Sequence, residues 1–125
     1  MPTDLVSWMM LIARLLLGGA FVFAGLRNLT QLPRLTGLMS ARGIPMAAQL
    51  TLFGVIFQLV CGALMVIDLW TPWAALGEAA FVIVAALLVH PFWVFPKGER
   101  GPHIAACTVN TALAGGYLLL AATYF

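Results

Sequence analysis

Four long apolar stretches, separated by short polar segments, dominate the sequence. They cover about residues 5–29, 46–69, 73–93 and 103–124. A helix of about 20 apolar residues can cross the ~30 Å hydrocarbon core of a bilayer. We therefore predict an all-α integral membrane protein, in which four transmembrane helices form a bundle and residues 1–125 form a single domain.

The segment between the first and second stretches has a different pattern. In residues 33–42, apolar residues recur at helical spacing, with arginines and hydroxyl residues between them. This pattern predicts a short helix that begins at Pro33 and lies in the membrane interface. Gly43-Ile44-Pro45 then ends the short helix and leads into the second span. At the start of the first span, Thr3 or Asp4 is the expected N-cap.

One charged residue interrupts the first span. Arg14 lies about nine residues from the start of the span, which at ~1.5 Å per residue places it near the midplane of the membrane. An arginine at that depth costs roughly 2.5–3.5 kcal/mol to insert, so we expect it to face other protein or a wet cavity. Gly18 and Gly25 lie on the same face of the helix. They would let a neighbouring helix come close enough to bond the guanidinium.

Polar residues in the other spans are the expected partners of Arg14. Gln58 in the second span and Glu78 in the third lie at similar depths, so the three residues are predicted to form a polar cluster inside the membrane. We expect Arg14 and Glu78 to pair, directly or through Gln58 or water. Two interpretations of the cluster stay open. It either holds the helices together, with backbone carbonyls as further partners of Arg14, or it acts chemically. In the second case Arg14 binds an anionic or quinone head group and Glu78 carries a proton.

Three further polar residues are secondary candidates. Asn110 in the fourth span, like Gln58, is typical of an interhelical hydrogen bond. His90 and His103 lie beside prolines at neighbouring helix ends, on the same side of the membrane. Two facing histidines can hold a b-type haem, but a histidine pair in the wet interface is the interpretation that we favour. We predict no metal site.

The two cysteines do not form a redox motif. Cys61 and Cys107 are expected at different depths, whereas a disulfide needs Cα atoms ~4.4–6.8 Å apart. The sequence has no Cys-x-x-Cys, which disfavours dithiol catalysis. We name no catalytic residue and expect no catalytic activity of the chain on its own.

Composition and charge narrow the classes of partner. Hydrophobic residues make up 63% of the chain and charged residues 8%, far outside the averages of soluble domains. Basic residues do not form a stripe with interleaved aromatic residues, so the expected partner is the lipid bilayer and not a nucleic acid. All basic residues other than Arg14 are assigned to the segments that follow the first and third spans or to the adjoining span end, so both termini are expected in the periplasm or outside the cell. These residues are Arg27, Arg34, Arg42, Lys97 and Arg100.

Several short motifs occur together in a defined order. They are Arg14 with Gly18 and Gly25, Gly43-Ile44-Pro45, Gln58 with Gly62, His90-Pro91-Phe92-Trp93, and Asn110 ahead of Gly115-Gly116. In this order they resemble the DoxX family of small four-helix bacterial membrane proteins. Two positions depart from the family pattern, because Gln58 replaces a glutamate and Val109 replaces a lysine.

The resemblance implies a multi-pass protein of the bacterial inner membrane. Relatives in this family occur as membrane subunits of thiosulfate:quinone oxidoreductase and as partners of thiol and superoxide defence enzymes. We therefore expect a non-catalytic membrane subunit or anchor of a redox complex, with membrane or peripheral redox proteins as partners. No cofactor is evident, and a quinone would be reached through the partner complex. The alternative is a small transporter or lipophile-binding protein that works as a homo-oligomer around Arg14 and Glu78.

Overall fold

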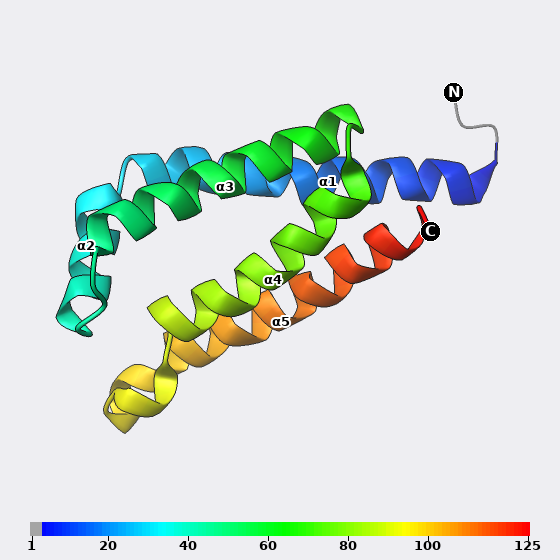
Figure 1. Ribbon diagram of the computed structural model, residues 1–125. Coiled ribbons are helices and arrows are strands. Elements are labelled where there is room, and N and C mark those ends of the chain that lie inside the picture. The colour runs from blue at the N-terminus through cyan, green and yellow to red at the C-terminus, as the bar shows by residue number, and fades with distance from the viewer. Residues whose placement is uncertain (1–3) are drawn as a thin grey trace.

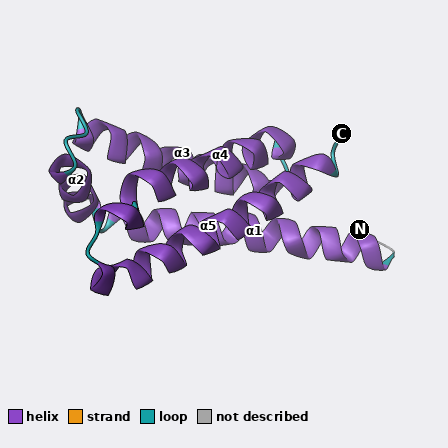
Figure 2. Ribbon diagram, turned by 90° about the horizontal axis from the view of Figure 1, so that it is seen from below, coloured by secondary structure: helices purple, strands orange, loops and turns teal. Residues whose placement is uncertain are grey.

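Four long helices form two antiparallel pairs (Figure 1). Helix α1 (Leu5–Leu29) packs beside α3 (Ala47–Ile67), and α4 (Thr71–Val89) packs beside α5 (Arg100–Ala122). The structure is a computed structural model that describes residues 4–125. Within these residues every regular element is a helix, as Figure 2 also shows, and this confirms the predicted all-α class.

The short helix predicted after the first span is present as α2 (Leu32–Ala41), with Pro33 in its first turn. It packs mainly against α3 and also contacts α4. Beyond its end, Arg42 donates hydrogen bonds from Nη1 to the carbonyl oxygens of Leu87 and Leu88, in the last turn of α4. Helix α2 and Arg42 therefore connect the two helix pairs at the end where the pairs diverge (Figure 1). We call this the α2 end, and the opposite end, where both chain termini lie, the termini end.

All four long helices are long and apolar enough to cross a membrane. The first span matches its predicted bounds of 5–29. The second begins at Ala47 and ends at Ile67, because Asp68 adopts a left-handed conformation with φ of 58°. The third helix begins at Thr71, two residues earlier than expected, with Pro72 in its first turn.

Prolines set the bounds at the other end of the third span. Helix α4 ends at Val89, since the residue before Pro91 is disfavoured in the helical region. Two short 3₁₀ helices follow, η1 (Phe92–Val94) and η2 (Lys97–Glu99). The fourth span, predicted to start at 103, begins at Arg100, because Pro102 fits the first turn, where its missing N–H is not needed.

The start of α1 is capped as the sequence predicts. The Asp4 side chain accepts a hydrogen bond of 2.7 Å from the backbone N–H of Ser7. The alternative cap, Thr3, lies outside the described residues. The carboxylate cap also holds the pKa of Asp4 below its usual value.

Glycines bring the backbones of α1 and α3 close together. A Cβ atom added at Gly18 would lie 2.9 Å from the carbonyl oxygen of Gly62, and one added at Gly62 would lie 2.9 Å from the carbonyl oxygen of Gly18. At Gly25, an added Cβ would lie 2.7 Å from the side chain of Leu59. The glycine stripes predicted from the spacing of these residues therefore form the contact surface of the first helix pair.

Candidate functional site

Arg14 caps the end of a neighbouring helix. Its Nη1 donates hydrogen bonds of 2.7 Å to the carbonyl oxygens of both Met65 and Val66. These carbonyls belong to the last turn of α3. That of Val66 has no backbone donor among the described residues, and that of Met65 accepts only from the N–H of Asp68. The contact between Gly18 and Gly62 lies one turn away and brings the two helices close enough for these bonds. The environment of Arg14 thus fits the structural interpretation, with backbone carbonyls as the partners.

Arg14 and Glu78 do not pair directly as predicted, and they lie at different levels of the bundle. Arg14 lies at the level of the last turn of α3, because its hydrogen-bond partners are the carbonyl oxygens of Met65 and Val66. Glu78 lies seven residues after Thr71, the first residue of α4, which is about 10 Å further into the bundle. Counting depth from the start of each helix failed because the helices do not start at one level.

Glu78 is a buried carboxyl without a hydrogen-bond partner. Its side chain is 0% exposed, and within residues 4–125 neither carboxyl oxygen has a partner. Glu78 belongs to α4, the helix that packs against both α3 and α5. A buried polar group without a partner costs about 1–3 kcal/mol. Such a group inside a membrane span is a functional candidate, with or without Arg14.

Gln58 has a partner that the sequence analysis did not name. Asn28, at the end of α1, donates a hydrogen bond of 3.0 Å from Nδ2 to Oε1 of Gln58. Asn110 in α5 donates a hydrogen bond of 2.9 Å from Nδ2 to the carbonyl oxygen of Val82 in α4. Each helix pair therefore has one interhelical amide hydrogen bond. The three residues Arg14, Gln58 and Glu78 do not form a hydrogen-bonded cluster among the described residues.

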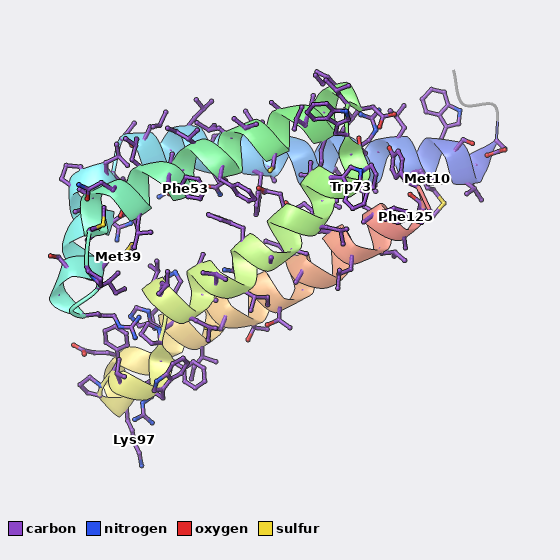
Figure 3. The ribbon with its side chains drawn as sticks, in the orientation of Figure 1. Met10, Met39, Phe53, Trp73, Lys97 and Phe125 are labelled. Carbon is purple, nitrogen blue, oxygen red and sulfur yellow. The ribbon has the colours of Figure 1, made fainter. Side chains whose placement is uncertain are left out.

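A cavity of about 690 Å³ lies between the two helix pairs and extends toward the α2 end. Gln58, Asn28 and Asn110 all line it, so the interhelical amides belong to the cavity wall. Most of the remaining wall is apolar, and its aromatic part includes Phe57 and Phe81, whose rings stack with centroids 5.9 Å apart. Figure 3 shows the side chains that α3 and α4 project into the space between the pairs. The lining comprises Phe21, Ala24, Asn28, Arg34, Leu35, Met39, Leu50, Thr51, Phe53, Gly54, Val55, Phe57, Gln58, Gly77, Ala80, Phe81, Val82, Val84, Ala85, Leu88, Val89, His90, Asn110 and Leu113.

The two histidines are in contact at the α2 end. Nδ1 of His90 lies 3.0 Å from Nδ1 of His103, a distance at which one ring donates to the other. Phe95 stacks on the ring of His103 at a centroid distance of 3.9 Å, and Sγ of Cys107 donates to the carbonyl oxygen of His90. His90 also lines the cavity, so the histidine pair lies beside the cavity wall at its α2 end. Within residues 4–125 no group of three or more His, Cys, Asp or Glu residues is arranged to hold a metal ion.

Some cavity residues could not be recognised from the sequence. Asn28 lies in the last turn of the first span, beside a basic residue, where an amide is not unusual. Ala80 and Ala85 carry no chemical signal at all, and only the divergence of the helix pairs makes them part of a wall. Gln58 and Asn110 were found because amides within an apolar span are unusual.

Comparisons with known proteins agree with this architecture. The model of the DoxX family matches residues 9–91, a range that includes Arg14, Gln58 and Glu78. The chain is also similar to the inner membrane protein YphA of Escherichia coli (strain K12). The two are 24% identical over 115 residues, which cover 92% of this chain and 82% of YphA. No solved structure matches the chain.

Proposed function

Because the chain belongs to the DoxX family of membrane proteins, we propose that it is the membrane subunit of a quinone-linked redox complex and that it holds the quinone between its two helix pairs. The observation that supports this proposal best is the cavity of about 690 Å³. Pockets for small molecules and cofactors typically enclose about 300–1,000 Å³, with mainly apolar walls and a few placed polar groups.

The cavity residues fit the chemistry of a quinone. A quinone has a flat ring, an apolar tail and two carbonyl oxygens that accept hydrogen bonds. The stacked rings of Phe57 and Phe81 offer an apolar wall to the ring. The Nε2 group of Gln58 has two N–H donors and no partner within residues 4–125, since Asn28 donates to Oε1. Asn110 uses Nδ2 for Val82 and keeps a second N–H on the same nitrogen. These two amides would orient a carbonyl-bearing ring.

A bound quinone would supply two-electron redox chemistry, and the contribution of this chain is to bind and orient it. The redox partner is inferred from the family resemblance, because relatives occur as membrane subunits of thiosulfate:quinone oxidoreductase. The chain would then act as a binding subunit or anchor, as the sequence led us to expect.

The location and orientation follow from the same inference. YphA is named as an inner membrane protein, and we assign this chain to the bacterial inner membrane as well. The five basic residues other than Arg14 all belong to the α2 end, where Figure 3 labels Lys97. This end would face the cytoplasm, with both termini in the periplasm. Labelling of a Lys97→Cys variant that lacks Cys61 and Cys107 tests the orientation. An impermeant maleimide should label it only after lysis, and labelling of intact cells would reverse the assignment.

Quinone binding is tested with purified protein in nanodiscs and a short-tailed ubiquinone. Ala80→Trp places a large side chain at an exposed position of the cavity wall, and Ala112→Trp makes the same change at an exposed position of α5 outside it. We expect saturable binding to the wild type and to Ala112→Trp, with about tenfold weaker binding to Ala80→Trp, the loss of about 1.4 kcal/mol of contact. Equal binding to all three proteins would contradict the proposal.

A second candidate function uses the same cavity without a redox partner. In that case the protein is a lipophile-binding protein or a small oligomeric transporter. Extraction in mild detergent separates the two candidates. Co-migration with a redox protein supports the subunit, whereas a homo-oligomer that binds the quinone alone supports the second candidate.

A further inference from the structure

A second, smaller cavity of about 310 Å³ adjoins the first at the α2 end. It is lined by Phe23, Ala24, Arg27, Asn28, Gln31 and Arg34, which belong to the last turns of α1 and the start of α2. Two arginines therefore face one small cavity whose lining contains no acidic residue. Two like charges in so small a space repel each other unless an anion lies between them.

These two guanidinium groups line the small cavity, whereas the other two arginines at this end are directed to backbone carbonyl oxygens. Arg42 donates to the last carbonyls of α4, and Arg100 donates to the carbonyl oxygen of Phe95. Arg34 donates from Nε and Nη2 to Oε1 of Gln31, which holds the guanidinium in the cavity and leaves Nη1 free. Arg27 makes no side-chain hydrogen bond within residues 4–125. A fixed guanidinium beside a second one with all its donors free is a good geometry for a phosphate group.

An apolar strip leads from this cavity along α1. Ile12, Leu16 and Phe23 lie on the same helical face as Arg27 and are 52%, 67% and 69% exposed. From Ile12 to Arg27 the strip is about 22 Å long, which is close to the length of an extended acyl chain. The small cavity therefore offers cationic groups to a lipid head group, and the strip along α1 offers an apolar surface to the acyl chain of the same lipid.

We propose that Arg27 and Arg34 bind the phosphate head group of an anionic phospholipid, whose acyl chain lies along the face of α1 formed by Ile12, Leu16 and Phe23. Basic pockets between transmembrane helices are suited to such head groups. Arg34 lines both cavities, but Arg27 and Phe23 line only the smaller one, and the acyl chain would lie on the outer face of α1 and not between the helix pairs. The lipid site therefore stands if quinone binding fails, and Ala80→Trp should leave it intact.

The experiment measures phosphatidylglycerol binding to the protein in neutral detergent by native mass spectrometry. Arg27→Gln removes a guanidinium that makes no recorded hydrogen bond in the described residues, so folding should be unaffected. Lys97→Gln is the matched control, because it removes one charge from the same end at an exposed position outside both cavities. We expect one retained lipid on the wild type and on Lys97→Gln, and about tenfold weaker retention by Arg27→Gln.

Two further titrations identify the source of the phosphate. Phosphatidylcholine and inorganic phosphate should each bind far more weakly than phosphatidylglycerol, because one lacks net negative charge and the other lacks the chain. Equal losses in Arg27→Gln and Lys97→Gln would show that the attraction is general and that no site exists. Inorganic phosphate that binds as tightly as the lipid would overturn the lipid assignment.

Discussion

Arg14 donates a hydrogen bond of 2.7 Å to the carbonyl oxygen of Val66, and the two residues lie one helical turn from the glycines at which their helices touch. Arg14 comes four residues before Gly18, and Val66 comes four residues after Gly62. Because the two helices are antiparallel, the hydrogen bond between Arg14 and Val66 and the contact between Gly18 and Gly62 follow one another along the same helix interface. The buried charge and the close glycine contact thus form a single structural unit at the termini end.

Replacing Arg14 by alanine should destabilise the protein. The change removes two charge-assisted hydrogen bonds. It leaves the carbonyl of Val66 without a partner among the described residues and leaves that of Met65 with only the backbone N–H of Asp68. Hydrogen bonds to charged groups contribute about 1.5–3 kcal/mol, so we expect a loss of this size in the free energy of unfolding. Arg14→Lys, which keeps the charge and a donor, should recover part of the loss. Chemical denaturation in mixed micelles measures both, and an unchanged unfolding midpoint in Arg14→Ala would show that the cap has no structural role.

Arg14 and Glu78 should behave as independent residues. They share no hydrogen bond, and Glu78 has no partner within the described residues. Substitutions at distant sites add to within about 0.3–0.5 kcal/mol. We therefore expect the losses of Arg14→Ala and Glu78→Ala to add in the double variant, and Glu78→Gln to stay close to the wild type. A double-mutant cycle checks this. A double variant that loses less stability than the two single variants together would contradict this expectation and support the ion pair that the sequence suggested.

The glycine contact predicts that alanine destabilises the protein at Gly62 but not at Gly19. Gly62→Ala places a methyl group 2.9 Å from the carbonyl oxygen of Gly18, where backbone must shift. Overpacking of this kind costs about 1–3 kcal/mol. Gly19→Ala is the matched control, since a Cβ at Gly19 meets nothing within 4 Å. Thermal unfolding should show a lower midpoint for Gly62→Ala and an equal or higher one for Gly19→Ala. Equal midpoints would mean that the two helices are not in this register.

The turn between α3 and α4 should lose stability in acid. Hydrogen bonds from the hydroxyls of Thr71 and Tyr124, each 2.6 Å long, hold the pKa of Asp68 below its usual value of 3.8. A lowered pKa in the folded state stabilises the protein above that usual value, and the stabilisation is lost as the pH falls through the folded-state pKa. Asp68→Asn should therefore show less acid destabilisation than the wild type below about pH 4.

The acid experiment compares the wild type with Asp68→Asn because Asp4 also makes the stability of the protein fall in acid. Its pKa is also lowered, by the cap to Ser7, and it contributes equally to both proteins. Unfolding midpoints recorded from neutral pH downward give the comparison. Parallel pH profiles for the wild type and Asp68→Asn would exclude a role for the Asp68 hydrogen bonds.

The sequence was sufficient to predict the spans, the short helix α2 and the glycine surface of α1. These features depend on local hydrophobicity, on prolines and on the spacing of small residues within one helix. The position of Arg14 and the partner of Gln58 depend instead on how one helix is shifted along another. Asn28 and Gln58 meet because α1 and α3 are antiparallel in one particular register, and the spacing within either helix does not determine that register. The cavity depends on the angle between the helix pairs, for which the sequence holds no local signal.

Photoaffinity labelling with an azido-quinone tests most directly whether the space between the helix pairs holds a quinone. The protein is labelled in native membranes, digested and mapped by mass spectrometry. We expect adducts on cavity residues of α3 and α4, such as Phe57 and Phe81, that disappear with excess unlabelled quinone and decrease in Ala80→Trp. Adducts spread over the exposed outer faces of α1 and α5, unaffected by the competitor or by Ala80→Trp, would contradict the proposed function.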